Sequence, residues 1–271
     1  MPEAPYPFSF TPLEDYSPKF KRIKFKRTDG ILTITLHKDE GEFSWNLETH
    51  RELSHVWNYV GLDPENKIII LTGTGNSFLD RSDYELDQLA AATPQWWQLV
   101  QQDAKKLLTD FLELEQPVIV ALNGPATIHS QIPMLADIIL ATPDTSISET
   151  HFPYTVPGDG HHIVWPLILG LNRARYLLLT QQGLTAQQAL DAGLVSEIVE
   201  RDNLLRRAEE IARQLLEMDP VALRAFRPIV MQPVKRAVLD GLSQGLLAEG
   251  YEIIRKLPEA EPLGQDERTR R

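Results

Sequence analysis

Short runs rich in β-branched residues, each bounded by turn-forming residues, recur five times between residues 31 and 199. The runs are ILTITL (31–36), KIIILTG (67–73), VIVAL (118–122), DIILAT (137–142) and VSEIV (195–199). Continuous apolar runs of this length are typical of strands that are covered on both faces. In segments 46–60 and 96–115 the apolar residues instead recur at helical spacing. The alternation of the two patterns predicts an α/β fold.

The strand-like runs stop near residue 203, and three helical patterns follow, over residues 203–219, 220–230 and 235–257. We therefore predict a core over residues 1–205 and a C-terminal helical region over residues 206–271. Terminal helices of this kind often pack onto a neighbouring subunit, so we expect the second region to support oligomerisation. Residues 1–20 are rich in proline and aromatic residues and are predicted to form an irregular arm, while the charged residues 265–271 are predicted to be frayed.

Composition excludes several classes of function. The chain has no cysteine, which excludes disulfides, thiolate metal sites and a cysteine nucleophile. A formal net charge of -11 disfavours binding to nucleic acid or to an anionic membrane surface. The first 30 residues lack the apolar segment of a signal peptide, and no run approaches the ~20 apolar residues of a membrane span. We therefore expect a cytoplasmic protein.

The segment HFPYTVPGDGHH, residues 151–162, holds three of the seven histidines of the chain together with one aspartate. A metal site is one interpretation, but His161 and His162 are successive residues whose side chains diverge, and no acidic ligand spacing accompanies them. The chain also has no GxGxxG after a strand, no Walker loop and no HExxH. We expect neither a metal nor a cofactor.

Two stretches carry a family resemblance: residues 67–86 followed by 117–147, and residues 156–199. They resemble the paired oxyanion-hole segments and the downstream core of the crotonase (enoyl-CoA hydratase/isomerase) superfamily, over roughly residues 22–256. The resemblance implies the spiral of ββα units of that superfamily, followed by C-terminal helices. It also implies homotrimers, which are commonly paired into hexamers.

The departures from the superfamily pattern concern the reactive centre. The chain has DRSD at 80–83 where AGAD is usual, and Ile128-His129-Ser130 where a glycine triplet is usual. Those glycines let backbone N–H groups approach a thioester oxygen closely. The glutamates of hydratase chemistry would fall near residues 132–133 and 150, where none stands, and Glu149 is the nearest. Chemistry on a CoA thioester is therefore disfavoured.

One branch of the superfamily is more similar, the β-diketone hydrolases that include 6-oxocamphor hydrolase. The similarity rests on NGPxTxHxxIP at 123–133, on HFP followed by VPGDGxHxVWP at 151–166, on Trp45 followed five residues later by His50, and on GLLAE ending at Glu249. Enzymes of this branch use water to cleave the carbon–carbon bond between the two carbonyls of a non-esterified 1,3-diketone. The resemblance implies the same retro-Claisen reaction here, on a small diketone.

The resemblance also implies roles for six catalytic residues. His50 and Glu249 would hold and deprotonate the attacking water, while Trp45 and His151 would bind the oxygen that becomes the enolate. His129 and Asp159 would form a dyad that moves the proton to or from the enolate carbon. Whether His50 with Glu249 or His129 with Asp159 activates the water is left open.

The remaining assignments concern the substrate pocket. Phe78 and Leu79, beside the altered oxyanion segment, are predicted to contact the hydrocarbon body of the substrate, and His162 is predicted to line the pocket. His161 occupies a variable place in GDGxH and is expected to face solvent.

Two other functions remain open from the sequence. The first is a CoA-thioester hydratase or isomerase with Glu149 or Asp159 as its base, and the second is a catalytically silent superfamily member that serves as a scaffold.

Overall fold

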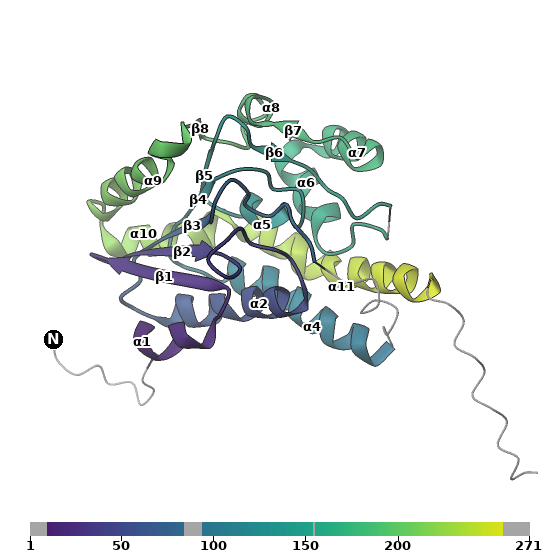
Figure 1. The fold of residues 1–271 in the computed structure, drawn as a ribbon, viewed down its shortest axis with the longest axis horizontal. Coiled ribbons are helices and arrows are strands. Elements are labelled where there is room, and N and C mark those ends of the chain that lie inside the picture. Colours follow the sequence, from purple (N-terminus) through teal and green to yellow (C-terminus); the bar gives the residue numbers. More distant parts are fainter. Residues whose placement is uncertain (1–9, 84–93, 154, 257–271) are drawn as a thin grey trace, which may run out of the picture.

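The computed structural model describes residues 10–83, 94–153 and 155–256. Its main sheet has the strand order β1-β2-β3-β4-β5-β8. The strands are β1 (Ile23–Thr28), β2 (Ile31–Leu36), β3 (Ile68–Gly73), β4 (Val118–Leu122), β5 (Ile138–Ala141) and β8 (Glu197–Ile198). Only β1 and β2 run antiparallel, and the other neighbouring strands of this sheet are parallel (Figure 1). Each of the five predicted strands is present.

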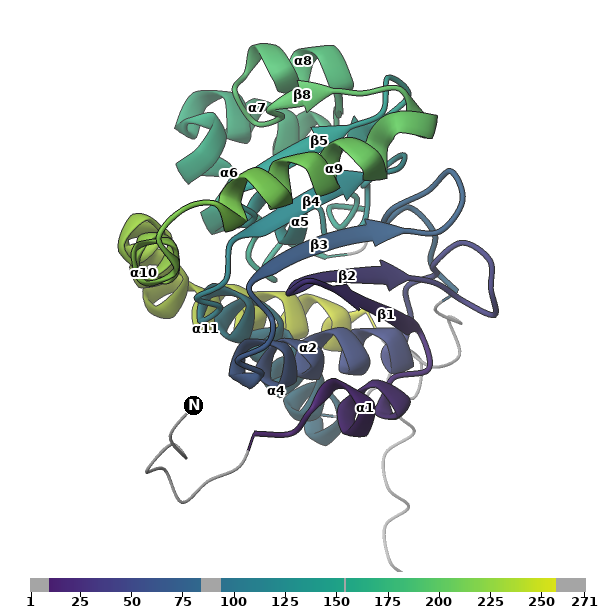
Figure 2. The same cartoon turned by 90° about the vertical axis from the view of Figure 1, so that its left-hand side faces the viewer.

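Helices cover both faces of this sheet, which explains the continuous apolar runs in the sequence. On one face α9 (Arg201–Leu216) lies over the strands, as Figure 2 shows. Its apolar side chains belong to the same buried cluster as Ile68 and Ile70. On the other face Ile69 and Leu71 join the larger core. That core includes α2 (Leu47–Leu62), α4 (Pro94–Leu112) and α11 (Gln232–Arg255). Because successive strand residues point to opposite faces, both sets are buried.

The segment between β4 and β8 carries most of the predicted site residues. It contains α5 (Gln131–Met134), β6 (Ser146–Ile147), α6 (His161–Leu169), α7 (Leu171–Thr180), β7 (Leu184–Thr185) and α8 (Ala186–Asp191). The short strands β6 and β7 pair antiparallel in a second sheet. Between α9 and α11 lies α10 (Pro220–Val230). Helix α11 packs against both α4 and α6, so the last described helix returns to the segment that follows β4.

The prediction of an irregular arm over residues 1–20 is wrong for its second half. Residues Leu13–Tyr16 form α1 and Ser17–Lys19 form a 3₁₀ turn, η1. Tyr16 and Phe20 are buried, and their rings pack on Phe25 of β1 at centroid distances of 5.7 Å each. Aromatic residues that bury this much surface order the segment that carries them. The predicted frayed end, 265–271, lies outside the described residues.

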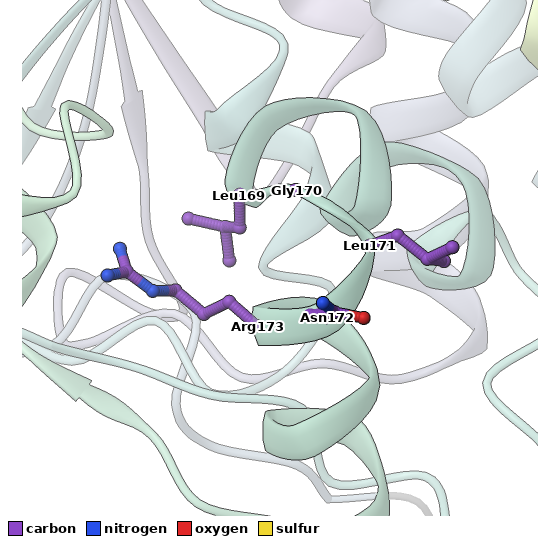
Figure 3. A pocket seen from close by; sticks show the side chains of 5 residues that line it. All are labelled: Leu169, Gly170, Leu171, Asn172 and Arg173. Carbon is purple, nitrogen blue, oxygen red and sulfur yellow. The ribbon is translucent and has the colours of Figure 1, made fainter.

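A surface hollow marks the junction of α6 and α7. It is lined by Leu169, Gly170, Leu171, Asn172 and Arg173 (Figure 3). Gly170 has a φ of 80° and lets the chain turn sharply between the two helices. The hollow lies at the opposite end of α6 from His161 and contains none of the predicted site residues. Within the described ranges, no helix is both long enough and apolar enough to cross a membrane.

Candidate active site

Trp45 and His50 are placed by the start of α2. Asn46 caps this helix, since its side chain accepts from Thr49 N at 2.9 Å and Thr49 Oγ1 accepts from Asn46 N at 2.7 Å. The Trp45 backbone is held in turn by Arg81, whose carbonyl accepts from Trp45 N at 2.7 Å. The two rings of Trp45 and His50 meet edge to face with centroids 5.4 Å apart. Both side chains are buried, so neither is the solvated group that a helix start usually carries.

His129 occupies the turn between β4 and α5. Its φ is 49°, the left-handed conformation that glycine adopts most easily, so the backbone at His129 is strained for a residue with a side chain. The imidazole lies against the Trp45 ring, with centroids 4.1 Å apart and planes inclined by 36°. It also lies 6.0 Å from the His50 ring and 5.3 Å from the His151 ring, centroid to centroid. The ring of His129 is therefore at the centre of the predicted residues.

Asp159 joins the histidines of the site through both oxygens of its carboxylate. Oδ2 lies 2.7 Å from Nδ1 of His129 and 3.8 Å from Nε2 of His151. Oδ1 lies 2.7 Å from Nδ1 of His161. The side-chain amide of Gln131 also donates to Oδ2, at 3.0 Å. The contact predicted between His129 and Asp159 is thus present, and the carboxylate has two more imidazoles beside it.

Glu149 and His151 form a second acid–imidazole pair at the same place. Oε1 of Glu149 lies 2.6 Å from Nδ1 of His151 and also accepts a hydrogen bond from the backbone N–H of His151. The Glu149 side chain is 1% exposed, whereas 18% of the His151 side chain is exposed. Oε2 of Glu149 is buried and has no hydrogen-bond partner within the described part of the chain. One imidazole is therefore flanked by two carboxylates, Glu149 on Nδ1 and Asp159 on Nε2.

Glu249 reaches the site from α11, through an unusually close contact with the segment before α6. A Cβ atom on Gly158 would lie 2.1 Å from the Gly245 carbonyl oxygen, so only glycine fits there. Thr155 links the segment before α6 to α11, because its hydroxyl donates to the Glu249 backbone carbonyl at 3.1 Å. Oε2 of Glu249 is buried without a hydrogen-bond partner in the part of the chain that the structure describes. The close packing of α11 is what brings this carboxyl to the histidines.

The surroundings raise the pKa values of two groups in the site, Glu249 and His151. Burial, reinforced by the negative charge of Asp159, raises the pKa of Glu249 to about 8. Burial disfavours the charged form of His151, but the charge of Asp159, the hydrogen bond to Glu149 and, once it ionises, the charge of Glu249 outweigh burial and raise the pKa of His151 to about 10. At neutral pH the site therefore holds a protonated, neutral Glu249 beside a positively charged His151.

The pKa values of three other groups in the site, His50, His129 and Asp159, are lowered. Burial, together with the nearby His129, lowers the pKa of His50 to about 3, so His50 is neutral at physiological pH. Burial also lowers the pKa of His129, against the attraction of Asp159. For Asp159 burial alone would raise the pKa, but the charges of His161, His151 and His129 reverse this and hold it well below its usual range. Asp159 is thus a carboxylate at any working pH.

The three residues that were predicted to contact the substrate lie in two different environments. The side chains of Phe78 and Leu79 are buried within the main core, in the same apolar cluster as Trp45. His162 lies on α6 with Nδ1 3.1 Å from the Pro157 carbonyl, and its ring packs on Gly245 of α11. These positions do not test the assignment of the three residues to substrate binding, which stays a prediction.

The expectation that His161 faces solvent is wrong. Its side chain is 0% exposed, with one ring nitrogen beside Asp159 and the other 3.3 Å from the Ser130 hydroxyl. Gly160 adopts a φ of 118° immediately before it, and this turn directs the first residue of α6 inward. Gln131 and Ser130 also belong to the site and were not predicted. Their only signal in the sequence was their position directly after His129.

Several of these groups are close enough to share a metal ion. His129, His151 and Asp159 form one such set, and Glu149, His151 and His161 form another, with the ligand atoms of each set within 4.8 Å of one another. In both sets His151 would have to lose a proton first. The hydrogen bonds described above already satisfy most of the same atoms, so the geometry does not require a metal.

A family model described as enoyl-CoA hydratase/isomerase matches residues 26–247, which is most of the chain. This protein belongs to the enoyl-CoA hydratase/isomerase family. The crotonase-type α/β fold with a helical C-terminal region, predicted from the sequence, is therefore confirmed.

Its relatives in the family differ in the chemistry that their names state. A β-diketone hydrolase from the cyanobacterium Anabaena sp. PCC 7120, solved with (S)-3-oxocyclohexyl acetic acid, is 37% identical, with a TM-score of 0.85 over 89% of this chain and 97% of that chain. A short-chain-enoyl-CoA hydratase from Clostridium acetobutylicum is 28% identical over 78% of this chain and 82% of that protein. A carnitinyl-CoA dehydratase from Citrobacter koseri is 29% identical over 81% and 84%.

Proposed function

We propose that this member of the enoyl-CoA hydratase/isomerase family is a cofactor-independent β-diketone hydrolase. It would cleave the carbon–carbon bond between the two carbonyls of a non-esterified 1,3-diketone and release a keto acid. The observation that carries the proposal is the buried carboxylate of Asp159 with three imidazoles around it, where hydratase chemistry would need an open, glycine-lined approach to a thioester. The 37% identity with a β-diketone hydrolase supports the same function.

The attacking water needs a base, and Glu249 is suited to that role. Its buried Oε2 has no protein partner in the described part of the chain, and its pKa of about 8 makes it a stronger base than an ordinary carboxylate. Glu249 in its ionised form takes a proton from water while the water oxygen bonds to one carbonyl carbon. His50, neutral and beside Trp45, is the predicted second partner of that water. The product of this step is a tetrahedral adduct.

Collapse of the adduct breaks the carbon–carbon bond, and the bonding electron pair passes to the second carbonyl as an enolate. His151 carries a positive charge at neutral pH and is suited to stabilise this oxyanion, together with the indole N–H of Trp45. The side-chain donors replace the backbone donors that the family pattern places at the oxyanion. His129, held by Asp159, then relays to the enolate carbon the proton that Glu249 took from water, which completes the ketone and leaves Glu249 ionised for the next cycle.

A CoA-thioester hydratase or isomerase is the second candidate function, because Glu149 offers a specific alternative base. This carboxylate is buried beside the histidines, with one oxygen unpartnered within the described ranges, and several relatives in the family are named as acting on CoA esters. The Glu149–His151 hydrogen bonds argue against it. These hydrogen bonds occupy Oε1 of Glu149. The side-chain hydrogen bond to His151 also lowers the pKa of Glu149 despite its burial, so Glu149 is a weaker base than an unpaired buried carboxylate.

One assay distinguishes the candidates. The purified protein is incubated with cyclic and bicyclic 1,3-diketones, loss of the enol absorbance is followed, and the keto acid is identified by mass spectrometry. Crotonyl-CoA and enzyme-free samples run in parallel, and a chelator arm tests for a metal requirement. Turnover of diketones, unchanged by chelator, supports the proposal. Turnover of crotonyl-CoA alone would refute it in favour of the second candidate, and turnover of neither would favour a non-catalytic scaffold.

Assembly into a homotrimer, or a dimer of trimers, is part of the proposal for the region 206–271. Helices α10 and α11 expose large apolar side chains, among them Val221 (76%), Ile229 (71%) and Leu247 (64%). Such a surface is typical of an interface between subunits. Light scattering coupled to size-exclusion chromatography measures the mass directly, and a monomer would contradict this expectation. Location in the cytoplasm is likewise proposed, and fractionation of cells that express the protein tests it.

A further inference from the structure

We infer that His161 is a positioning residue of this active site, which holds Oδ1 of Asp159 so that Oδ2 faces His129 and His151. The inference deepens the proposed function and rests on it, because it assigns a role in the same reaction. The GDGxH pattern leaves position 161 unspecified, so the resemblance to β-diketone hydrolases implies no role for His161.

The two oxygens of Asp159 have separate partners. Nδ1 of His161 lies 2.7 Å from Oδ1, whereas Nδ1 of His129 lies 2.7 Å from Oδ2. Nε2 of His151 lies 3.8 Å from that same Oδ2. A carboxylate is planar, so fixing one oxygen fixes the direction of the other. The contact with His161 at one oxygen therefore sets the direction in which the other oxygen faces the reacting histidines.

His161 is itself held from both sides. Its Nε2 lies 3.3 Å from Oγ of Ser130, and that hydroxyl donates its proton to the Ser148 carbonyl at 2.7 Å. The Ser130 oxygen is then available to accept, so each ring nitrogen of His161 faces a hydrogen-bond acceptor of the protein. The ring also lies beside the buried Trp165, with centroids 6.1 Å apart. A group fixed in this way can hold Asp159 in one orientation.

Glycines flank Asp159 on both sides, so contacts of the folded protein have to hold its side chain in place. It stands between Gly158 and Gly160, and Gly160 has a φ of 118°. Glycines on either side leave the peptide free to rotate in the absence of other contacts. Gln131 supports the opposite oxygen by donating to Oδ2 at 3.0 Å. Each carboxylate oxygen therefore has one partner that takes no part in the reaction, His161 on Oδ1 and Gln131 on Oδ2.

The test compares three variants at this position. His161→Asn keeps a donor near the place of Nδ1, His161→Leu has almost the same size without a donor, and His161→Phe keeps a ring without a donor. We expect His161→Leu to lower kcat on the diketone by roughly 10–100-fold with KM little changed, the usual cost of losing an outer partner of a reacting group. His161→Asn should restore most of that loss. His161→Phe provides the donor-free readout if the leucine variant does not fold.

A double-mutant cycle separates positioning from a general structural effect. If His161 acts through Asp159, adding His161→Leu to Asp159→Asn costs little beyond Asp159→Asn alone. Additive losses in the cycle would overturn the inference. The matched control is His37→Phe, a buried histidine at 7% exposure outside the site, which should leave kcat unchanged.

A measurement without turnover keeps the inference separate from the proposed function. Proton NMR of the wild type should show a low-field signal from the His129 Nδ1–H that is bonded to Asp159. The signal should be retained in His161→Asn and lost or moved in His161→Leu and His161→Phe. If no diketone is turned over but the signal responds in this way, the proposed reaction fails and the positioning role stands. A signal unchanged in all three variants would refute the positioning role.

Discussion

Oδ2 of Asp159 lies 2.7 Å from Nδ1 of His129, although one residue precedes α6 and the other follows β4. Both side chains are buried, and Asp159 remains ionised because the charges around it hold its pKa well below the usual range. A carboxylate in this position fixes the orientation of the imidazole and increases its basicity. The pair is therefore suited to move a proton between the protein and a carbon atom of the substrate.

Replacing Asp159 by Asn removes this charge and keeps the shape of the side chain. We expect kcat on a 1,3-diketone to fall by roughly 10²–10⁴-fold, the usual contribution of a general acid or base. Steady-state kinetics measure the loss. Asp144→Asn is the matched control, since Asp144 is exposed and pairs with Arg201 outside the site. Equal rates in the two variants would contradict the role of Asp159.

The indole N–H of Trp45 should be needed at the developing enolate oxygen. Trp45→Phe keeps an aromatic ring against His129, 4.1 Å away between centroids in the wild type, but removes the donor. We expect kcat to fall by roughly 10²–10³-fold, as when one oxyanion donor is lost. Trp57→Phe provides the comparison, because Trp57 is fully buried in the core and its ring nitrogen has no partner in the described part of the chain. A similar loss in both variants would point to packing instead.

The dependence of kcat/KM on pH should be bell-shaped. Glu249 must be ionised to act as a base, so activity rises as pH passes its pKa of about 8. His151 must be protonated to stabilise the oxyanion, so activity falls as pH passes its pKa of about 10. Initial rates between pH 6 and pH 11 with one diketone test both limbs. A maximum at pH 6 that declines before pH 8 would exclude Glu249 as the base.

Glu249 should also make the folded state less stable as pH rises. Its pKa is raised in the folded protein from 4.5 to about 8, so the folded state binds the proton more tightly than the unfolded chain does. The free energy of unfolding therefore falls as pH rises between these two values. Glu249→Gln cannot titrate, and we expect it to be more stable than the wild type at pH 8, by a margin that shrinks at pH 5. Urea unfolding at both pH values measures the difference, and a margin that does not depend on pH would refute the shift.

Much of the fold could be predicted from local pattern. Ile68 to Leu71 form a continuous apolar run because alternate residues face different helical layers, and such a run admits a buried strand but few other structures. Strand β1 was not predicted, because the predicted strands were identified from continuous apolar runs, whereas IKFKRT alternates apolar residues with lysine and arginine on an edge strand. Strands β6 and β7 have two residues each and leave no periodic signal. The N-terminal helix depends on tertiary contacts of Tyr16 and Phe20, which no local pattern reports.

The sequence by itself determined the alternation of strands and helices, the exclusion of thiol chemistry, and the identity of the histidines and acids that distinguish this chain within its family. Only the tertiary structure decided which of these side chains meet. Gly160, with its left-handed backbone, turns His161 inward, and Gly158 and Gly245 let α11 carry Glu249 against the same segment. Contacts of this kind depend on the approach of distant backbones, and pKa values depend on the burial that results. Neither is encoded in the spacing of residues along the chain.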